Sequence, residues 1–195
     1  MPVRVLSAAN VSNIHEPRCR EPDVHILLPS LLQLKSISER FTKLATTTTP
    51  ARNSGFTNPL NPTSTTSPKL QLSANMHGSL KLNITTDALD ISSVWEGLSN
   101  PELDPTQVEG GLDGIRTHPS TRMKEDGGWA SVLIDGRDWG RVLSVGRLGG
   151  RVIACFVDGH ALILYVYLDT DGDIAPGGES DTESVLTYYI SSYAS

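Results

Sequence analysis

The feature that most constrains the fold is a pair of amphipathic segments, each preceded by a short strand pattern and followed by stretches that alternate apolar and polar residues. The first amphipathic segment runs from Ser30 to Ala45 and the second from Arg137 to Arg147. Apolar residues that recur every three to four positions are typical of a helix with one buried side, whereas strict alternation is typical of a half-buried strand. The chain is therefore expected to place two helices against antiparallel strands.

Basic side chains occupy the polar side of both predicted helices. On a helical wheel the first segment groups apolar residues on one side, namely Leu34, Ile37, Phe41, Leu44 and Ala45. The opposite side carries three cations with Glu39 between them: Lys35, Arg40 and Lys43. The second segment groups Trp139, Val142, Leu143 and Gly146. Its other side carries Arg137, Arg141 and Ser144. Both helices are thus predicted to bury one side and to present positive charge on the other.

These cations contrast with the charge of the whole chain. The formal net charge is -6 and the isoelectric point is about 5.3, so a general attraction to nucleic acid is not expected. Any contact with a polyanion must therefore be local. For either helix alone, ordinary solvation of lysine and arginine explains the pattern, but two such helices in similar contexts favour a surface that faces a polyanion.

Strand patterns occupy most of the remaining ordered sequence. They cover Val24–Leu28, Lys69–Asn75, Ser79–Thr85, Leu89–Trp95, Trp129–Ile134, Arg151–Val157, His160–Leu168 and Ser184–Ile190. The pair Asp158–Gly159 predicts a two-residue hairpin turn, because both residues tolerate the positive φ angles of a type I′ turn. The order of helices and adjacent strands predicts an α+β fold with antiparallel sheets.

The chain is predicted to form one domain over residues 24–195, since its length allows one sizeable core. Residues 1–23 read as a connector. Residues 46–69 are rich in threonine, proline, serine and asparagine and predict a low-complexity insertion. Residues 97–128 and 169–183 are polar and poorly periodic, and are predicted to be long loops.

No chemistry of an enzyme or a metal site is predicted. Neither the two cysteines nor the five histidines have the spacing of metal ligands, and the sequence contains no phosphate-binding glycine loop and no recognisable set of nucleophile, base and orienting group. The longest apolar runs are too short to cross a bilayer. The expectation is a protein without cofactor, metal or membrane span.

The order of strands and helices resembles half of a sliding-clamp protomer of the proliferating-cell-nuclear-antigen type, whose helices line the hole for DNA. More specifically, four segments look like the carboxy-terminal half of the Hus-one checkpoint protein family: EPDVHILLPSLLQLKSISERFTKLA, ANMHGSLKLNIT, RVIACFVDGHALILYVYL and VLTYYIS. The resemblance extends from about Pro2 to Tyr189, apart from the insertion and the two loops. It implies one clamp-like domain, with antiparallel sheets and two helices on one face.

By this resemblance, the protein would be a non-catalytic subunit of the heterotrimeric nine-one-one DNA-damage clamp, which encircles DNA in the nucleus and scaffolds checkpoint signalling and repair. The implied partners are two related clamp subunits, a clamp-loader ATPase and double-stranded DNA bound without sequence specificity. Because subunits of this family contain two similar domains, the chain is expected to be a truncated subunit, with residues 1–23 as a remnant of the interdomain linker.

The resemblance also assigns roles to particular residues. The positions expected to face DNA are Lys35, Arg40, Lys43, Arg137 and Arg141. The strand Leu89–Trp95 is expected to pair with a neighbouring subunit, which places Leu89, Ile91 and Trp95 at the interface; these three residues would otherwise fill the core of their own chain.

A different class of function stays open at this point. The chain could be a stand-alone α+β protein-interaction module whose basic helix faces are only solvated. The arrangement of the helices discriminates between the two interpretations: a clamp requires them to lie side by side with their cations on a common surface.

Overall fold

The computed structural model describes residues 19–48, 68–106, 108, 110–148, 150–168 and 184–193. The strands are β1 (Val24–Leu27), β2 (Lys69–Ala74), β3 (Leu80–Thr86), β4 (Leu89–Trp95), β5 (Ala130–Asp135), β6 (Val152–Val157), β7 (Ala161–Leu168) and β8 (Ser184–Ser191). The helices are α2 (Leu31–Thr48), α3 (Gly111–Thr117), α4 (Pro119–Asp126), α5 (Gly136–Val142) and the 3₁₀-helix η1 (Leu143–Leu148). The predicted α+β class is confirmed. For each of the eight strands predicted above, the first and the last residue lie within one position of those of the observed strand.

The strands form two four-stranded antiparallel sheets, in the orders β1-β6-β7-β8 and β4-β3-β2-β5. A turn at Asp158–Gly159 joins β6 to β7, and Gly159 has φ +65°, but the turn has three residues and not the predicted two, because Val157 pairs with Ala161 and His160 also belongs to the turn. The Gly159 N–H donates to the carbonyl of Ser131 in β5 over 2.8 Å. The same turn therefore connects the two sheets.

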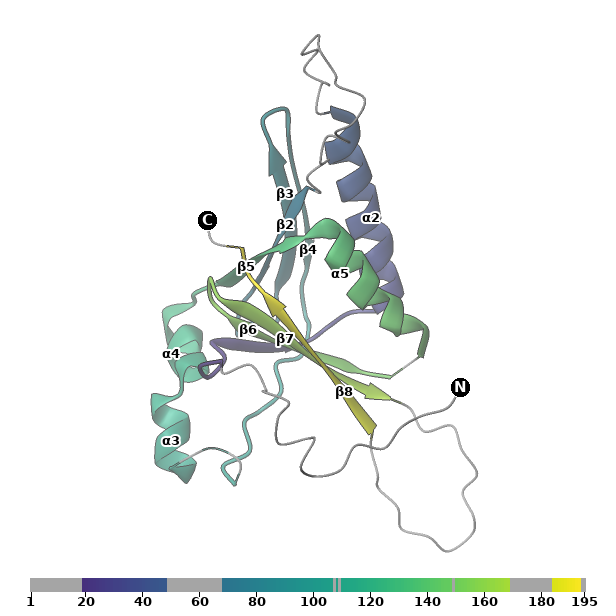
Figure 1. Ribbon diagram of the computed structural model, residues 1–195. Coiled ribbons are helices and arrows are strands. Elements are labelled where there is room, and N and C mark those ends of the chain that lie inside the picture. Colours follow the sequence, from purple (N-terminus) through teal and green to yellow (C-terminus); the bar gives the residue numbers. More distant parts are fainter. Residues whose placement is uncertain are drawn as a thin grey trace, which may run out of the picture.

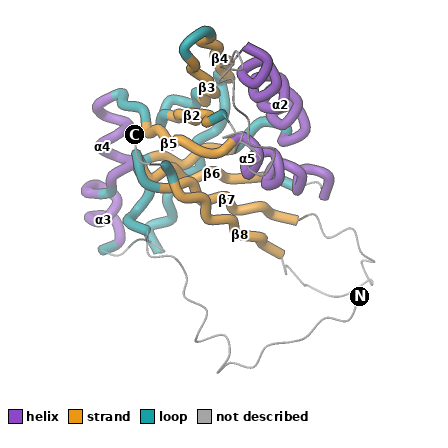
Figure 2. The backbone as a smooth tube through the Cα atoms, turned by 45° about the horizontal axis from the view of Figure 1, so that its top comes forward, coloured by secondary structure: helices purple, strands orange, loops and turns teal. Residues whose placement is uncertain are grey.

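Helices α2 and α5 lie side by side on one side of the sheets, while α3 and α4 lie on the other (Figures 1 and 2). One hydrophobic core joins both sheets to α2, α5 and η1. Trp139 of α5 is fully buried in it, and its indole Nε1–H donates to Ser38 Oγ of α2 over 3.1 Å. Both predicted helices therefore pack into a common core, but Leu44, which the helical wheel places on the apolar side of α2, is 46% exposed.

The second predicted helix is shorter than its pattern indicates. The α-helix ends at Val142 and the chain continues as the 3₁₀-helix η1. The backbone of η1 comes so close to α2 that a Cβ on Gly146 would lie 2.5 Å from Leu31 Cβ. Close contact with α2 thus accompanies the change of helix type.

The predicted long loop at 97–128 is not entirely irregular, because it contains α3 and α4. Helix α4 begins at Pro119, a residue favoured in the first turn, and the ring Nδ1 of His118 accepts the Ser120 N–H over 3.2 Å. Gly127, with φ +64°, ends the helix. These local signals were available in the sequence, but the segment lacks a long apolar period.

The edges of the predicted insertion also differ from the structure. Residues 46–48 continue helix α2 and Lys69 begins β2. The rest of the insertion, at 49–67, the loop at 169–183 and the connector at 1–18 lie outside the described residues.

Each sheet has one edge strand whose backbone bonds to a further segment of the chain and one edge strand that is open. At β1 the Leu27 N–H donates to Ser99 O, and at β5 Leu133 O accepts the Tyr193 N–H, both over 2.8 Å. Strands β4 and β8 are outermost and have no further strand partner among the described residues. Each of these two strands therefore presents an open edge.

Replacing Gly78 by alanine is expected to destabilise the turn between β2 and β3. Gly78 has φ +77°, which costs a residue with a Cβ about 1–2 kcal/mol, and that Cβ would overlap the carbonyl oxygen of Leu98. Gly97→Ala is the matched control, since Gly97 has φ +71° but open space at its Cβ position. Urea unfolding should show a larger loss for Gly78→Ala; equal losses would contradict the steric argument.

Candidate nucleic-acid interface

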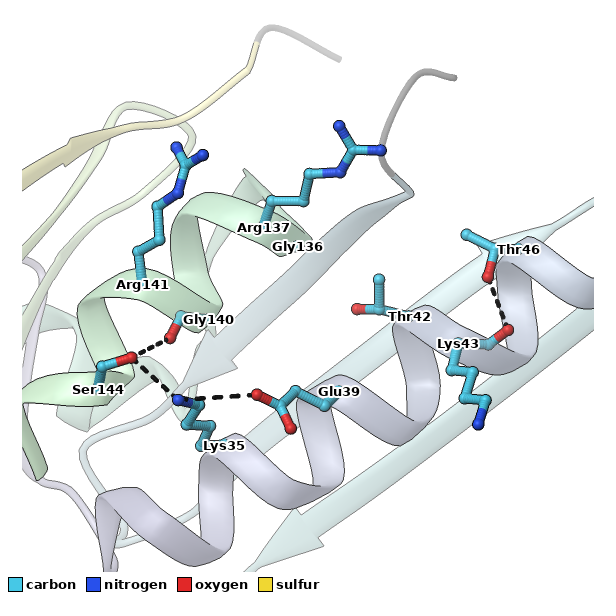
Figure 3. A pocket seen from close by; sticks show the side chains of 10 residues that line it. All are labelled: Lys35, Glu39, Thr42, Lys43, Thr46, Gly136, Arg137, Gly140, Arg141 and Ser144. Carbon is cyan, nitrogen blue, oxygen red and sulfur yellow. Dashed lines mark hydrogen bonds and ion pairs between the residues drawn. The ribbon is translucent and has the colours of Figure 1, made fainter. Parts of the chain in front are cut away.

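A groove of about 640 Å³ lies between α2 and α5 (Figure 3). Four of the five cations predicted to face DNA line it: Lys35, Lys43, Arg137 and Arg141. The hydroxyl groups of Thr42, Thr46 and Ser144 and the carboxylate of Glu39 also line it. Residues about 100 positions apart in the sequence thus form one predominantly basic surface.

Local sequence signals orient the part of the groove that α5 contributes. Asp135 caps this helix, and its Oδ1 accepts the N–H groups of Arg137 over 2.7 Å and Asp138 over 3.3 Å. Arg137 then lies in the first turn, and Arg141 follows one turn later on the same side. Both arginines extend into open space in Figure 3.

Helix α2 provides the opposite wall. At the start of this helix, the Leu34 N–H donates to the carbonyl of Ser30 over 3.0 Å. Lys35, Glu39, Thr42 and Thr46 follow at helical spacing along the wall. Lys43 is exposed and its ammonium group points away from α5. Because the cations on the two helices diverge, the groove suits an extended polyanion better than a single small anion.

The cations differ in how strongly other side chains engage them. Lys35 Nζ donates to Ser144 Oγ over 2.9 Å, lies 3.7 Å from Glu39 Oε1, and belongs to a side chain that is only 20% exposed. Arg141 pairs with Asp138 over 2.9 Å, but its side chain is 79% exposed. An exposed ion pair of this kind contributes little free energy, so the Arg141 guanidinium can exchange Asp138 for another anion.

Arg40, the fifth predicted cation, is exposed but does not line the groove. It lies three residues before Lys43, and residues at this spacing are neighbours on a helix surface. The basic surface therefore continues around α2 beyond the groove.

The predicted interface residues lie on β4, which is an edge strand as the interpretation requires. However, Leu89, Ile91 and Trp95 are half-buried, and the last two pack against the core of their own chain. Val94 points to the other side and is 49% exposed. A neighbouring strand would therefore meet the backbone edge and Val94, which the sequence reasoning missed although the alternation of β4 places it opposite Ile91 and Trp95.

Two smaller cavities lie elsewhere. One, of about 430 Å³, lies between α5 and the end of β8 and includes Asp135 and Asp138. The other, of about 270 Å³, lies between α4 and the segment after Asn100 and includes His25. Burial lowers the pKa of His25, and the nearby His118 lowers it further. Neither cavity gathers cations as the groove between α2 and α5 does.

Within the described ranges, no group of three or more histidine, cysteine, aspartate or glutamate side chains could hold a metal ion. No helix in these ranges is long and apolar enough to span a bilayer.

The fold defines the class of protein. The structure matches the crystal structure of proliferating cellular nuclear antigen from Entamoeba histolytica with a TM-score of 0.51, over 99% of this chain and 52% of that chain. At 10% sequence identity this match concerns the fold alone. The chain has a sliding-clamp fold, which confirms the predicted architecture.

The sequence comparisons specify the family within this class. A family model described as Hus1-like protein matches residues 1–194, and the chain belongs to this family. The chain is 40% identical over 194 residues to "Checkpoint protein hus1" of Schizosaccharomyces pombe, covering 99% of this chain and 55% of the relative. It is 22% identical over 191 residues to "Checkpoint protein hus1 homolog" of Dictyostelium discoideum, covering 97% and 51%. The chain spans about half the length of these curated relatives.

Proposed function

We propose that this chain is part of a non-catalytic subunit of a heterotrimeric DNA-damage checkpoint clamp that encircles double-stranded DNA in the nucleus. The observation that carries this proposal is the groove between α2 and α5, where four cations from two distant segments line one surface. Membership of the Hus1-like family and the sliding-clamp fold support it. Residues 24–195 would form one clamp-like domain.

The proposed contact with DNA is electrostatic. Lysine and arginine facing phosphates give an attraction that weakens as salt rises and that does not depend on base sequence. No aromatic side chain lines the groove, so it offers no platform on which bases could stack. Such a surface suits a clamp that slides along a duplex.

The proposed assembly uses the open edge of β4. An unpaired strand edge attracts another strand, and pairing across this edge would continue the sheet into a neighbouring subunit. The partners in this proposal are two related clamp subunits, with a clamp-loader ATPase that places the ring on DNA. The assembled ring would scaffold signalling and repair factors.

The alternative is a stand-alone protein-interaction module. Basic helix faces that were only solvated would not need to share a surface, yet α2 and α5 lie side by side and their cations line one groove (Figure 3). This arrangement favours the clamp proposal.

Co-precipitation with the two related clamp subunits tests the assembly. Both this chain and a chimera that adds the part of the S. pombe relative outside the match should be used. We expect the chimera to capture both subunits, and Val94→Glu in the chimera to weaken capture of one of them by about tenfold or more, since an uncompensated charge at an interface costs about 2 kcal/mol or more.

Leu112→Glu is the matched control, because Leu112 is also exposed but lies on α3, away from β4. It should leave capture unchanged. If neither version of the protein binds the two subunits, the clamp proposal fails and the interaction module takes its place. If both substitutions are neutral, assembly does not use the β4 edge.

A further inference from the structure

Lys35 differs from the other cations of the groove in where its charge lies. Its Nζ donates to Ser144 Oγ over 2.9 Å and lies 3.7 Å from Glu39 Oε1. Ser144 in turn donates to the carbonyl of Gly140 over 3.0 Å. The ammonium group is thus held between α2 and the junction of α5 with η1, as Figure 3 shows. It is not directed outward as Arg137 and Arg141 are.

This bond joins α2 to η1, and a second, deeper bond joins α2 to α5. The deeper link joins the indole of Trp139 to Ser38 Oγ over 3.1 Å. Lys35 and Ser38 are three residues apart on α2 and lie one above the other. Their partners lie on two consecutive helices: Trp139 is on α5, and Ser144 follows it by five residues, on η1. Two links at different depths oppose a rotation of α5 about its axis, in addition to the packing of Trp139 in the core.

The rotation of α5 determines where its arginines point. Arg137 and Arg141 lie on the groove side of this helix, and their guanidinium groups extend beyond it. If α5 turned, both groups would move together relative to Lys43 on α2. Long charged side chains gain affinity from being held in a productive direction, because less conformational entropy is lost on binding.

We propose that Lys35 is a positioning residue of the proposed DNA-facing surface. Through Ser144 it holds α5 and η1 against α2, so that Arg137 and Arg141 point outward, and its own ammonium group makes no phosphate contact. This inference rests on the proposed function and deepens it: it separates the cation that builds the surface from those that touch DNA.

The test uses Lys35→Met, which keeps the apolar stem and removes only the ammonium group, beside Ser144→Ala and the double variant. Amide hydrogen exchange on the 195-residue chain should speed up at residues 140–146 in Lys35→Met, and the double variant should exchange no faster than Ser144→Ala, which already removes the link to Lys35 together with the bond from Ser144 to Gly140. Unchanged exchange in Lys35→Met, or additive increases, would overturn the proposal.

The second measurement is the salt dependence of duplex binding by the clamp assembled with the chimera. Lys35→Met should weaken binding by about two- to tenfold, the range expected for one lost hydrogen bond, with an unchanged slope of log affinity against log salt. Lys43→Met is the control, and should lower the slope by about 0.9 because one phosphate contact is lost. A reduced slope for Lys35→Met would show that Lys35 touches phosphate and would overturn the positioning role.

Failure of the proposed function gives a different result. In that case Lys43→Met would also leave duplex binding and its salt slope unchanged. The hydrogen-exchange comparison does not involve DNA, and it would still decide whether Lys35 and Ser144 act as one link between the helices.

Discussion

Replacing Lys43, Arg137 and Arg141 together by glutamate is expected to abolish retention of the assembled clamp on DNA. Losing three phosphate contacts lowers the salt slope of binding by about 2.7, which at physiological salt corresponds to about a hundredfold loss of affinity before repulsion by the new carboxylates is counted. Retention on a circular duplex over a series of salt concentrations measures the effect. Lys35 is left unchanged so that the spacing of the helices is preserved.

A matched triple variant separates a local effect from a change in total charge. Arg116, Arg122 and Lys124 are exposed cations on α3 and α4, on the side of the molecule away from the groove (Figure 1). Their replacement by glutamate changes the net charge by the same amount and should leave most of the retention intact. If both triple variants lose retention equally, the groove is not the DNA-facing surface.

Trp139→Ala is expected to lower the free energy of unfolding by about 3–5 kcal/mol, the range for removing a large buried aromatic side chain. Trp139 is 0% exposed and lies where α5 packs against α2, so its loss leaves a cavity at the joint between the two cation-bearing helices. Urea unfolding followed by circular dichroism measures the loss. A decrease below about 1 kcal/mol would mean that the core closes around the missing indole.

Two further variants divide the contribution of Trp139 into volume and hydrogen bonding. Trp139→Phe keeps most of the apolar volume and should cost less than alanine, since Ser38 Oγ still donates to the carbonyl of Leu34 over 2.7 Å. Ser38→Ala leaves the indole N–H buried without its acceptor, which costs about 1–3 kcal/mol. If Ser38→Ala is neutral, the hydrogen bond between the helices contributes nothing net.

The positions of the strands could be predicted because their signals are local, whereas the pairings of β1 with β6 and of β2 with β5 join distant segments and were not predicted. The alternation in β3 and the turn signal at Asp158–Gly159 require only neighbouring residues, and the structure shows the alternation and a turn at this place, one residue longer than predicted. Helices α3 and α4 were missed for a corresponding reason. Helices of seven and eight residues are too short to be stable alone. Helix α4 is stabilised by contact with β1, and the spacing of residues within α4 does not predict this contact.

The candidate site was predicted in part. Helical periodicity correctly placed Lys35, Lys43, Arg137 and Arg141 on polar sides, since the side of a helix follows from spacing alone. It could not separate Arg40, which misses the groove, from these four. Nor could it show that Ile91 and Trp95 pack against their own core, because alternation divides a strand into two faces without saying which one is buried.

By itself, the sequence determined the positions of the strands and of the two basic helices, the side of each basic helix that carries the cations, and the family to which the chain belongs, because these depend on short-range periodicity and on the residues themselves. Only the tertiary structure decided that the two basic helices share a groove, and that one lysine in it bonds to a serine 109 residues away. The physical reason is that packing brings distant segments together. The contacts of a charged side chain therefore depend on which groups the fold places beside it.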